Sequence, residues 1–267
     1  VIRALHAFHL CFSRPATCCR LPHMAKPKKP AAKRGRKRQK PKSQPLRQWL
    51  RRWAFRGALS AVAVALLAVL FYAVVNPTRT PYMAAEARRL GSVDHQWVDF
   101  KNISPTMIRS VVAAEDANFC NHWGFDMAAI RLAMADGGTR GASTLSQQVV
   151  KNVYLWQGRS WPRKALEASL TPLVELVWTK RRILEVYLNV AEFDEGVFGV
   201  EAAARTYFRT DPGKLSAVQA ARLAAMLPSP KTRSAAKPTD FVRRRSKAIL
   251  DGAATIRADG RASCFED

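Results

Sequence analysis

Hydrophobic and polar positions divide the chain of 267 residues into three regions. Residues 1–56 are rich in lysine, arginine and proline and have no apolar periodicity, which is typical of a disordered, solvated tail. Residues 57–75 form an unbroken apolar run without a charged residue. Further along the chain, apolar residues recur at helical spacing. The pattern predicts a mainly α fold, with one helical domain over residues 80–250 behind a single apolar helix, and a C-terminal tail over residues 251–267.

Capping signals mark where the helices of this domain begin. Ser104 is a typical N-cap with Pro105 at the first helical position, and Asp126 is a typical N-cap for the next helix. Ser216 and Gln219 have the spacing of a capping box. Further helices are predicted over residues 143–154, 160–178, 179–188, 199–207, 216–226 and 239–250. Neither a run of alternating strand positions nor an internal repeat is visible in the sequence.

The apolar run at residues 57–75 predicts a transmembrane helix. At roughly 1.5 Å per residue it spans about 28 Å, close to the hydrocarbon thickness of a bilayer. A cleaved signal peptide is the alternative, but its apolar region is usually shorter, and no small-residue cleavage site follows this run. Because the basic cluster precedes the run, the positive-inside rule predicts a cytoplasmic N-terminus and an extracytoplasmic domain after Val75.

The formal net charge of +24 invites a nucleic-acid partner, but its distribution argues against one. Residues 1–56 hold 17 of the 44 Lys and Arg residues and no acidic residue, so the remainder carries 27 basic and 20 acidic residues, a net charge of +7. That remainder has no zinc-finger, basic-zipper or single-strand-stacking motif. We therefore expect no nucleic-acid partner.

The cysteine pattern predicts no disulfide framework. Five cysteines are an odd number, and Cys11, Cys18 and Cys19 lie outside the predicted domain. Cys120 and Cys264 can pair only if folding brings them together, which their positions in the sequence do not indicate. Unpaired thiols are the favoured interpretation.

The stretch "EDANFCNHWGFD" at residues 115–126 concentrates several candidate metal ligands. Cys120, His122 and the carboxylates of Asp116 and Asp126 are all competent, but zinc sites usually combine two pairs of ligands, and this lone pair has no second one. We therefore expect no metal site. A helix cap is the favoured role for Asp126, and a hydrogen-bonded organiser of the loop is favoured for His122.

Glu115, at the predicted end of a helix, is the candidate general base of the same stretch. Phe119, Trp123 and Phe125 lie nearby in the sequence and are expected to remove the carboxylate partly from water. Burial disfavours the charged form, so the pKa of the carboxyl rises towards that of a useful base.

Residues 137–167 form a second group of candidate residues. Thr144, Gln147 and Lys151 share one helix face, for which a solvated polar stripe is the alternative interpretation. Four cations lie beside glycine-rich loops, a combination that suits a phosphate or pyrophosphate group. They are Lys151, Arg159, Arg163 and Lys164. Glu167 lies next to them and is expected to orient an arginine or to help bind an ion.

These motifs together resemble the peptidoglycan glycosyltransferase family, in particular its monofunctional biosynthetic transglycosylases. The resemblance covers roughly residues 80–250. The matching motifs are, in order, "AAEDANFCNHWGFD" at 113–126, "GASTLSQQVVKN" at 141–152, "RSWPRKALE" at 159–167, "RILEVYLNVAEF" with "GVFGVEAAARTYF" at 182–208, and "AARLAAMLPSP" at 220–230.

The resemblance implies a lysozyme-like, mainly α domain that polymerises lipid II into β-1,4-linked peptidoglycan and releases undecaprenyl pyrophosphate. Lipid II, the growing glycan chain and the membrane are the implied partners, together with other proteins of cell-wall synthesis. The implied location is the bacterial cytoplasmic (inner) membrane, with the domain on its periplasmic or extracellular side. No cofactor is required by the sequence, and dependence on Mg²⁺ or another divalent cation is left open.

The resemblance also implies roles for individual residues. Glu115 is the implied base that deprotonates the acceptor sugar, and Glu167 is the second acidic residue. Lys151 and Arg159 are implied to neutralise the departing pyrophosphate. The remaining residues are implied to shape the sugar sites. They are Asp116, Phe119, His122, Ser143, Thr144, Gln147, Gln148, Asn152 and Arg163.

Elementary chemistry favours the same activity over two alternatives, a membrane-anchored lytic hydrolase and a binding protein without catalysis. A pyrophosphate is a good leaving group, so the reaction needs one base and a cationic clamp, and one displacement step predicts inversion. A hydrolase needs a proton donor for a poor leaving group and has no evident need for Lys151 and Arg159. The letters S-A-A-K at residues 234–237 match a transpeptidase motif, but no K-T-G follows, so no transpeptidase activity is expected.

Overall fold

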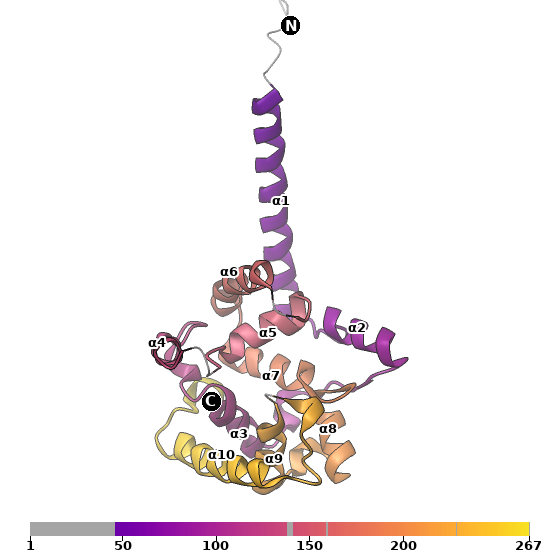
Figure 1. Ribbon diagram of the computed structural model, residues 1–267, viewed down its shortest axis with the longest axis vertical. Coiled ribbons are helices and arrows are strands. Elements are labelled where there is room, and N and C mark those ends of the chain that lie inside the picture. The colour runs from indigo at the N-terminus through magenta and orange to yellow at the C-terminus, as the bar shows by residue number, and fades with distance from the viewer. Residues whose placement is uncertain (1–45, 138–140, 159, 228, 267) are drawn as a thin grey trace, which may run out of the picture. The chain divides into compact units, whose positions relative to one another are not determined.

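The computed structural model describes residues 46–137, 141–158, 160–227 and 229–266 (Figure 1). The chain divides into two units, Val1–Gln48 and Trp49–Asp267. The predicted tail at residues 1–56 therefore falls mostly outside the described residues. The second unit holds every element from α2 onward and nearly all of α1.

The second unit is mainly helical, as the sequence predicted. Its helices are α1 (Leu46–Val74), α2 (Pro81–Leu90), α3 (Pro105–Glu115), α4 (Met127–Ala135), α5 (Leu145–Tyr154), α6 (Trp161–Val177), α7 (Lys180–Val190), α8 (Gly199–Phe208), α9 (Ala217–Met226), α10 (Asp240–Ala258) and α11 (Ser263–Glu266). Several of the predicted caps are present: Asp126 accepts from the main chain of α4, and Ser216 and Gln219 form a capping box. Ser104 stands at the N-cap position of α3 without a side-chain hydrogen bond.

A small sheet, which the sequence did not predict, joins two parts of the chain. Its strands are β1 (Asp94–His95), β2 (Glu192–Asp194) and β3 (Val197–Phe198), in the order β1-β3-β2. β1 runs parallel to β3, and β2 runs antiparallel to it. Strands of two or three residues are too short to show an alternating pattern, which explains why they were missed.

Helix α1 is long and apolar enough to cross a bilayer. It begins at Leu46, before the predicted start at residue 57, and most of its large side chains are exposed. Its C-terminal turns are held by the domain, because Trp178 Nε1 donates to Val69 O at 2.8 Å. The Arg182 guanidinium also donates to Val75 O at 2.9 Å and Tyr72 O at 3.1 Å. These carbonyls lie at the end of a helix, where no further turn satisfies them.

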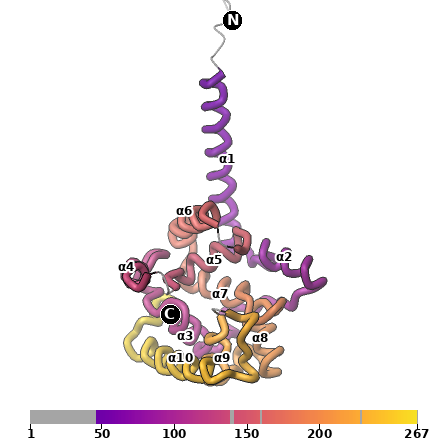
Figure 2. The backbone as a smooth tube through the Cα atoms, viewed as in Figure 1, coloured from indigo at the N-terminus to yellow at the C-terminus, as the bar shows by residue number. Residues whose placement is uncertain are grey.

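Two groups of packed helices form the core. Helices α3, α9 and α10 pack on one another, and α5 packs on both α6 and α7 (Figure 2). Apolar residues at helical spacing supply the contacts: Val149 and Val150 of α5, and Leu184 and Leu188 of α7, are fully buried. The first group contains the end of α3 with Glu115, and the second contains α5 with Gln148 and Lys151. The predicted site residues of α3 and α5 therefore meet where the two groups adjoin.

The C-terminal segment consists of the end of α10, a turn at residues 259–262 and α11, which ends at Glu266. Helix α10 continues to Ala258, past its predicted end at residue 250, and α11 follows. Phe265 is buried in the core although it lies in the segment expected to be a tail. A four-residue helix with one apolar anchor has no periodicity that a sequence pattern can reveal.

Candidate active site

Glu115 is the last residue of α3, and its carboxyl group is largely buried. Gln148 Nε2 of α5 donates to Glu115 Oε2 at 2.9 Å. The other oxygen, Oε1, is buried, has no hydrogen-bond partner among the described residues and lies 3.9 Å from Nη2 of Arg245. Burial raises the pKa of Glu115, against the lowering effects of the Gln148 hydrogen bond and of the nearby Arg245 and Lys151 charges. An acceptor oxygen is thus available on a carboxyl group that binds a proton more readily than usual.

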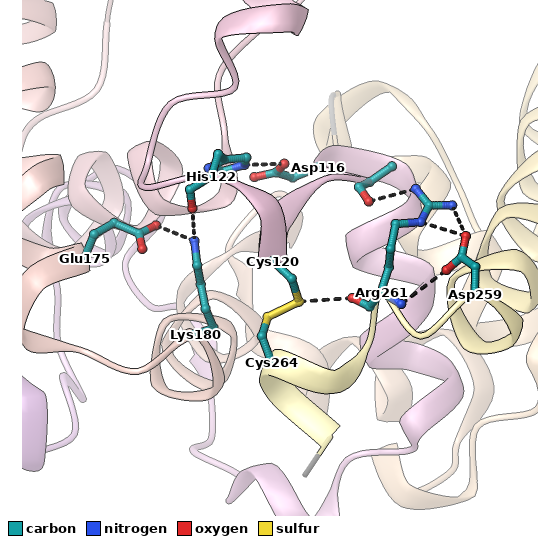
Figure 3. Close-up of a disulfide and its surroundings, with 9 residues drawn as sticks. Asp116, Cys120, His122, Glu175, Lys180, Asp259, Arg261 and Cys264 are labelled. Atoms are coloured by element: carbon teal, nitrogen blue, oxygen red, sulfur yellow. Dashed lines mark hydrogen bonds and ion pairs between the residues drawn. A yellow bond between two sulfur atoms is a disulfide. The ribbon is translucent and has the colours of Figure 1, made fainter.

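Asp116 fastens the end of α3 to the start of α5. Its Oδ1 lies 2.9 Å from His122 Nε2 (Figure 3). Its Oδ2 accepts from Leu145 N at 3.0 Å. The second bond satisfies a free N–H at the α5 N-terminus. Phe119 is fully buried below this loop. The structure therefore gives Asp116, Phe119 and His122 supporting contacts, consistent with the interpretation of His122 as a loop organiser.

A buried ion pair supports the loop from the α6–α7 side. Lys180 Nζ donates to the His122 carbonyl at 2.7 Å and to Glu175 Oε1 at 2.9 Å (Figure 3). It also lies 4.3 Å from the centre of the Phe119 ring. Ser146 donates to the same Glu175 carboxylate. Sequence reasoning missed this network, because nothing in the local pattern distinguishes Lys180 from its basic neighbours.

A disulfide joins Cys120 to Cys264, so the expectation of unpaired thiols was wrong. The two cysteines are 144 residues apart in sequence, and their Cα atoms are 5.7 Å apart. Packing of α11 under the loop brings them together, which no local pattern could reveal. Arg261 Nη1 also donates to Ala117 O at 3.1 Å, so two connections tie the C-terminal segment to the loop after Glu115 (Figure 3).

Thr144 and Gln147 form a capping box at the N-terminus of α5. Both are buried, and Thr144 Oγ1 also donates to Gly124 O at 2.6 Å. The polar stripe of α5 is therefore not a solvated face. Ser143 lies just before the cap and is exposed, and its hydroxyl accepts from Lys164 Nζ at 3.3 Å.

Lys151 lies one turn after Gln148 on α5. Both residues line a cavity of about 380 Å³. Burial lowers the pKa of Lys151, and the charges of Arg163 and Lys164 act in the same direction. Among the residues that the structure describes, no carboxylate forms an ion pair with Lys151. The cavity is otherwise lined by Tyr82, Asn152, Gln157, Tyr187, Ala191, Glu192, Leu227, Ser229, Pro230, Lys231 and Thr232.

Glu167 of α6 orients two cations. Its Oε2 accepts from Arg163 Nη1 at 2.8 Å, and its Oε1 accepts from Lys164 Nζ. Arg163 and Lys164, with Ser160 and Trp161, line a second hollow of about 310 Å³. Arg159, predicted to belong to the same cluster, lies outside the described residues.

The described residues offer no fitting site for a resident divalent cation. No group of three or more His, Cys, Asp and Glu side chains converges in this part of the chain. Asp116 already contacts His122 Nε2 and accepts from Leu145 N, and Glu167 accepts from Arg163 and Lys164.

Two arginines near Glu115 were not predicted. Arg245 of α10 donates from Nη2 to Ala114 O at 3.3 Å, and Arg233 donates to Ala225 O at 3.0 Å. Both place positive charge near the Glu115 carboxyl. In the sequence, Arg245 belongs to a run of three arginines on an amphipathic helix, which is indistinguishable from a solvated basic face.

The domain is mainly α, and the largely buried Glu115 carboxyl group is bonded to Gln148, which lines a cavity with Lys151. A family model described as Transglycosylase matches residues 57–254. The chain is similar to the biosynthetic peptidoglycan transglycosylase of Jannaschia sp. (strain CCS1), with 60% identity over 203 residues, covering 76% of this chain and 85% of the relative. It is also similar to the protein of that name from Caulobacter vibrioides, with 45% identity over 210 residues, 77% of this chain and 92% of the relative. The chain belongs to the transglycosylase family, which confirms the predicted resemblance.

Proposed function

We propose that this chain is an inverting peptidoglycan glycosyltransferase that polymerises lipid II into β-1,4-linked glycan strands and releases undecaprenyl pyrophosphate. Its relatives carry the name biosynthetic peptidoglycan transglycosylase. The observation that carries the proposal is that Gln148, which donates to the largely buried Glu115 carboxyl group, lines one cavity together with the half-buried cation Lys151.

In the proposed reaction, Glu115 takes the proton from the 4-hydroxyl of the acceptor sugar. The oxygen attacks the anomeric carbon of the growing chain, a new C–O bond forms, and the bond to the pyrophosphate breaks. The pyrophosphate leaves with the electron pair, and Lys151, Arg163 and Arg159 stabilise its charge. Oε1 of Glu115, which has no hydrogen-bond partner in the part of the chain that the structure describes, is the oxygen proposed to accept the proton.

The other predicted residues support these groups in the proposal. Gln148 orients Glu115, and Glu167 holds Arg163 and Lys164 in place. The loop and cap residues fix the positions of α3 and α5 relative to each other; they are Asp116, Phe119, His122, Thr144 and Gln147. Ser143 and Asn152 remain candidate sugar contacts, since Ser143 is exposed and Asn152 lines the cavity.

A lytic hydrolase is not favoured. Breaking a glycosidic bond in finished glycan requires a protonated acid beside the leaving oxygen and usually a second free carboxylate. The second acidic residue, Glu167, accepts from Arg163 and Lys164, so its role here is to hold cations that can neutralise a leaving anion. Transpeptidation belongs to other proteins in this proposal.

We place the domain on the outer side of the bacterial cytoplasmic membrane, with α1 as its anchor. The basic residues before α1 favour a cytoplasmic N-terminus. The Cys120–Cys264 disulfide supports the same orientation independently, because disulfides persist in oxidising compartments outside the cytosol. Lipid II and the growing glycan are the proposed partners. Other cell-wall synthesis proteins are a further expected class of partner, and nucleic acid has no role in this proposal.

The purified full-length protein, given lipid II in detergent or vesicles, tests this function. We expect glycan strands of increasing length and stoichiometric release of undecaprenyl pyrophosphate. Cleavage of finished glycan without polymerisation would establish the hydrolase instead. Binding without turnover would leave only a binding protein.

A further inference from the structure

A polar cavity of about 320 Å³ lies between the start of α7 and the 3₁₀ turn η1 (Phe100–Asn102), apart from the cavity at Lys151. Three of its side chains are cations and two are carboxylates. The cavity is lined by Asp99, Phe100, Lys101, Thr179, Arg181, Arg182 and Glu185. None of these residues takes part in the proposed reaction, so the cavity needs an explanation of its own.

The charges of this cavity do not cancel. Glu185 is already neutralised, because its two oxygens accept from Arg182 Nη1 at 2.7 Å and from the main chain of η1 at 3.1 Å. Lys101 and Arg181 form no ion pair within the part of the chain that the structure describes. Asp99 is the only other carboxylate of the described lining, so three cations against two carboxylates leave a net charge of +1.

The Arg181 guanidinium has a fixed orientation. Its central carbon lies 4.5 Å from the centre of the ring of Phe100, which is itself buried. Stacking fixes the plane of the guanidinium and leaves the N–H donors at its edge for a ligand. Such a planar fork of donors matches two oxygens of a phosphate group. Lys101, which is exposed on the same cavity, adds a second cation on a flexible stem.

Arg182 places the cavity at the C-terminal end of α1. Its side chain lines the cavity and donates to Tyr72 O at 3.1 Å and Val75 O at 2.9 Å. The charge-free run at residues 57–75 ends at these carbonyls. The cavity therefore lies within the length of one arginine side chain of the level where α1 is expected to leave the hydrocarbon core. Phospholipid headgroups occupy this interfacial layer.

We propose that this cavity binds the headgroup of an anionic phospholipid, with the phosphodiester at Lys101 and Arg181 and with Asp99 accepting from a headgroup hydroxyl. Phosphatidylglycerol has this chemistry, because it combines one negative phosphate with a glycerol that carries hydroxyls. The net charge of +1 favours it over a zwitterionic headgroup, which brings no net charge to compensate it. A lipid bound here ties the domain to the membrane surface at a second point besides α1. The inference uses the proposed membrane span of α1 and goes beyond the proposed reaction.

The test removes the two unpaired cations and leaves Arg182 untouched. A double variant, Lys101→Gln with Arg181→Gln, is compared with Arg244→Gln with Lys247→Gln, which removes the same charge from exposed positions on α10. None of the four side chains forms a hydrogen bond or ion pair with a described residue, so both variants are expected to fold. Native mass spectrometry of the full-length protein in detergent gives apparent dissociation constants. The probes are dioleoylphosphatidylglycerol, dioleoylphosphatidylcholine and glycerol 3-phosphate.

We expect the variant at Lys101 and Arg181 to bind phosphatidylglycerol at least about tenfold more weakly than the parent, and the α10 variant to match the parent. Phosphatidylcholine is expected to bind all three proteins equally and more weakly than phosphatidylglycerol binds the parent. The single change Lys101→Glu, at an exposed side chain that leaves the stacked Arg181 in place, is expected to weaken the binding of phosphatidylglycerol in the same direction.

Three results overturn the proposal. Unchanged affinity for phosphatidylglycerol in the variant at Lys101 and Arg181 means that the lipid does not bind in this cavity. An equal loss in that variant and in the α10 variant means that only the overall charge matters. Displacement of the lipid by glycerol 3-phosphate at equal concentration means that the cavity binds free phosphate esters rather than a membrane lipid.

Discussion

Gln148 connects Glu115 to the core of the domain: its Nε2 donates to Glu115 Oε2 at 2.9 Å, and its Oε1 accepts from the buried Tyr187 hydroxyl at 3.2 Å. The amide is therefore oriented by α7 before it meets the carboxyl group. An oriented donor stabilises the ionised carboxylate and fixes its rotamer, which leaves the second oxygen of Glu115 for the substrate.

Replacing Glu115 with Gln is expected to abolish polymerisation, with a loss of at least about 10²-fold, because the amide cannot take the proton from the acceptor hydroxyl. The raised pKa of Glu115 means that the folded state binds its proton more tightly than the unfolded state does. The charged carboxylate thus costs stability at neutral pH, and this cost disappears as pH falls below both pKa values. Glu115→Gln should therefore unfold at a higher temperature than the parent near neutral pH, with the difference closing in acid. Retained polymerisation would refute the assignment of the base.

Replacing Gln148 with Ala is expected to move the acid limb of the kcat/KM profile to higher pH. The hydrogen bond from Gln148 lowers the pKa of Glu115, so its removal raises that pKa further and the base becomes protonated earlier as pH falls. Gln157→Ala removes an amide from the same cavity without touching Glu115 and serves as the control. A pH profile that shifts equally in both variants, or in neither, argues against this role.

Replacing Lys151 with Ala is expected to slow the chemical step by about 10² or more, because a positioned charge next to the leaving group is lost. In the parent, burial lowers the pKa of Lys151, so the ammonium loses its proton at a lower pH than an ordinary lysine. As pH rises, activity should consequently begin to decline at a pH below the usual lysine pKa. Single-turnover rates with lipid II, measured across pH, report both effects. Unchanged turnover in Lys151→Ala would exclude it from the clamp.

The disulfide predicts a specific chemical pattern. Peptide mapping without reduction should recover Cys120 and Cys264 in one cross-linked fragment, and alkylation should reach them only after reduction. Joint replacement of both by Ser is expected to lower the free energy of unfolding by about 2–5 kcal/mol. Free alkylation of Cys120 in the untreated membrane protein would contradict both the pairing and the orientation argued from it.

Arg182 is expected to determine how firmly α1 is attached to the domain. Its guanidinium donates to Tyr72 O, Val75 O and Asn76 Oδ1 at the end of α1, and it pairs with Glu185. Arg182→Ala should therefore lower the free energy of unfolding by about 3 kcal/mol. Arg181→Ala, which removes a cation stacked on Phe100, is the neighbouring control. It should lower the free energy of unfolding by about 1 kcal/mol or less. Thermal unfolding in detergent and limited proteolysis near residue 78 measure the difference. Equal sensitivity of the two variants would mean that Arg182 does not fasten the helix.

Local patterns were sufficient for the features that local physics decides. The charge-free run that became part of α1, the caps at Asp126 and Ser216, and the apolar spacing of α5 and α7 are each set by residues within one or two turns. The motif residues Glu115 and Lys151 could likewise be selected from their chemistry and their resemblance to a family. These features need no knowledge of what packs against them.

Tertiary structure alone decided which distant residues meet. The pairing of Cys120 with Cys264, the approach of Arg245 to Glu115 and the anchoring of α1 by Arg182 each join segments more than a hundred residues apart. The burial of Thr144 and Gln147 in a cap also depends on the loop that covers them. The reason is physical: helix periodicity and capping are short-range effects, whereas desolvation and side-chain pairing depend on neighbours supplied by the rest of the fold.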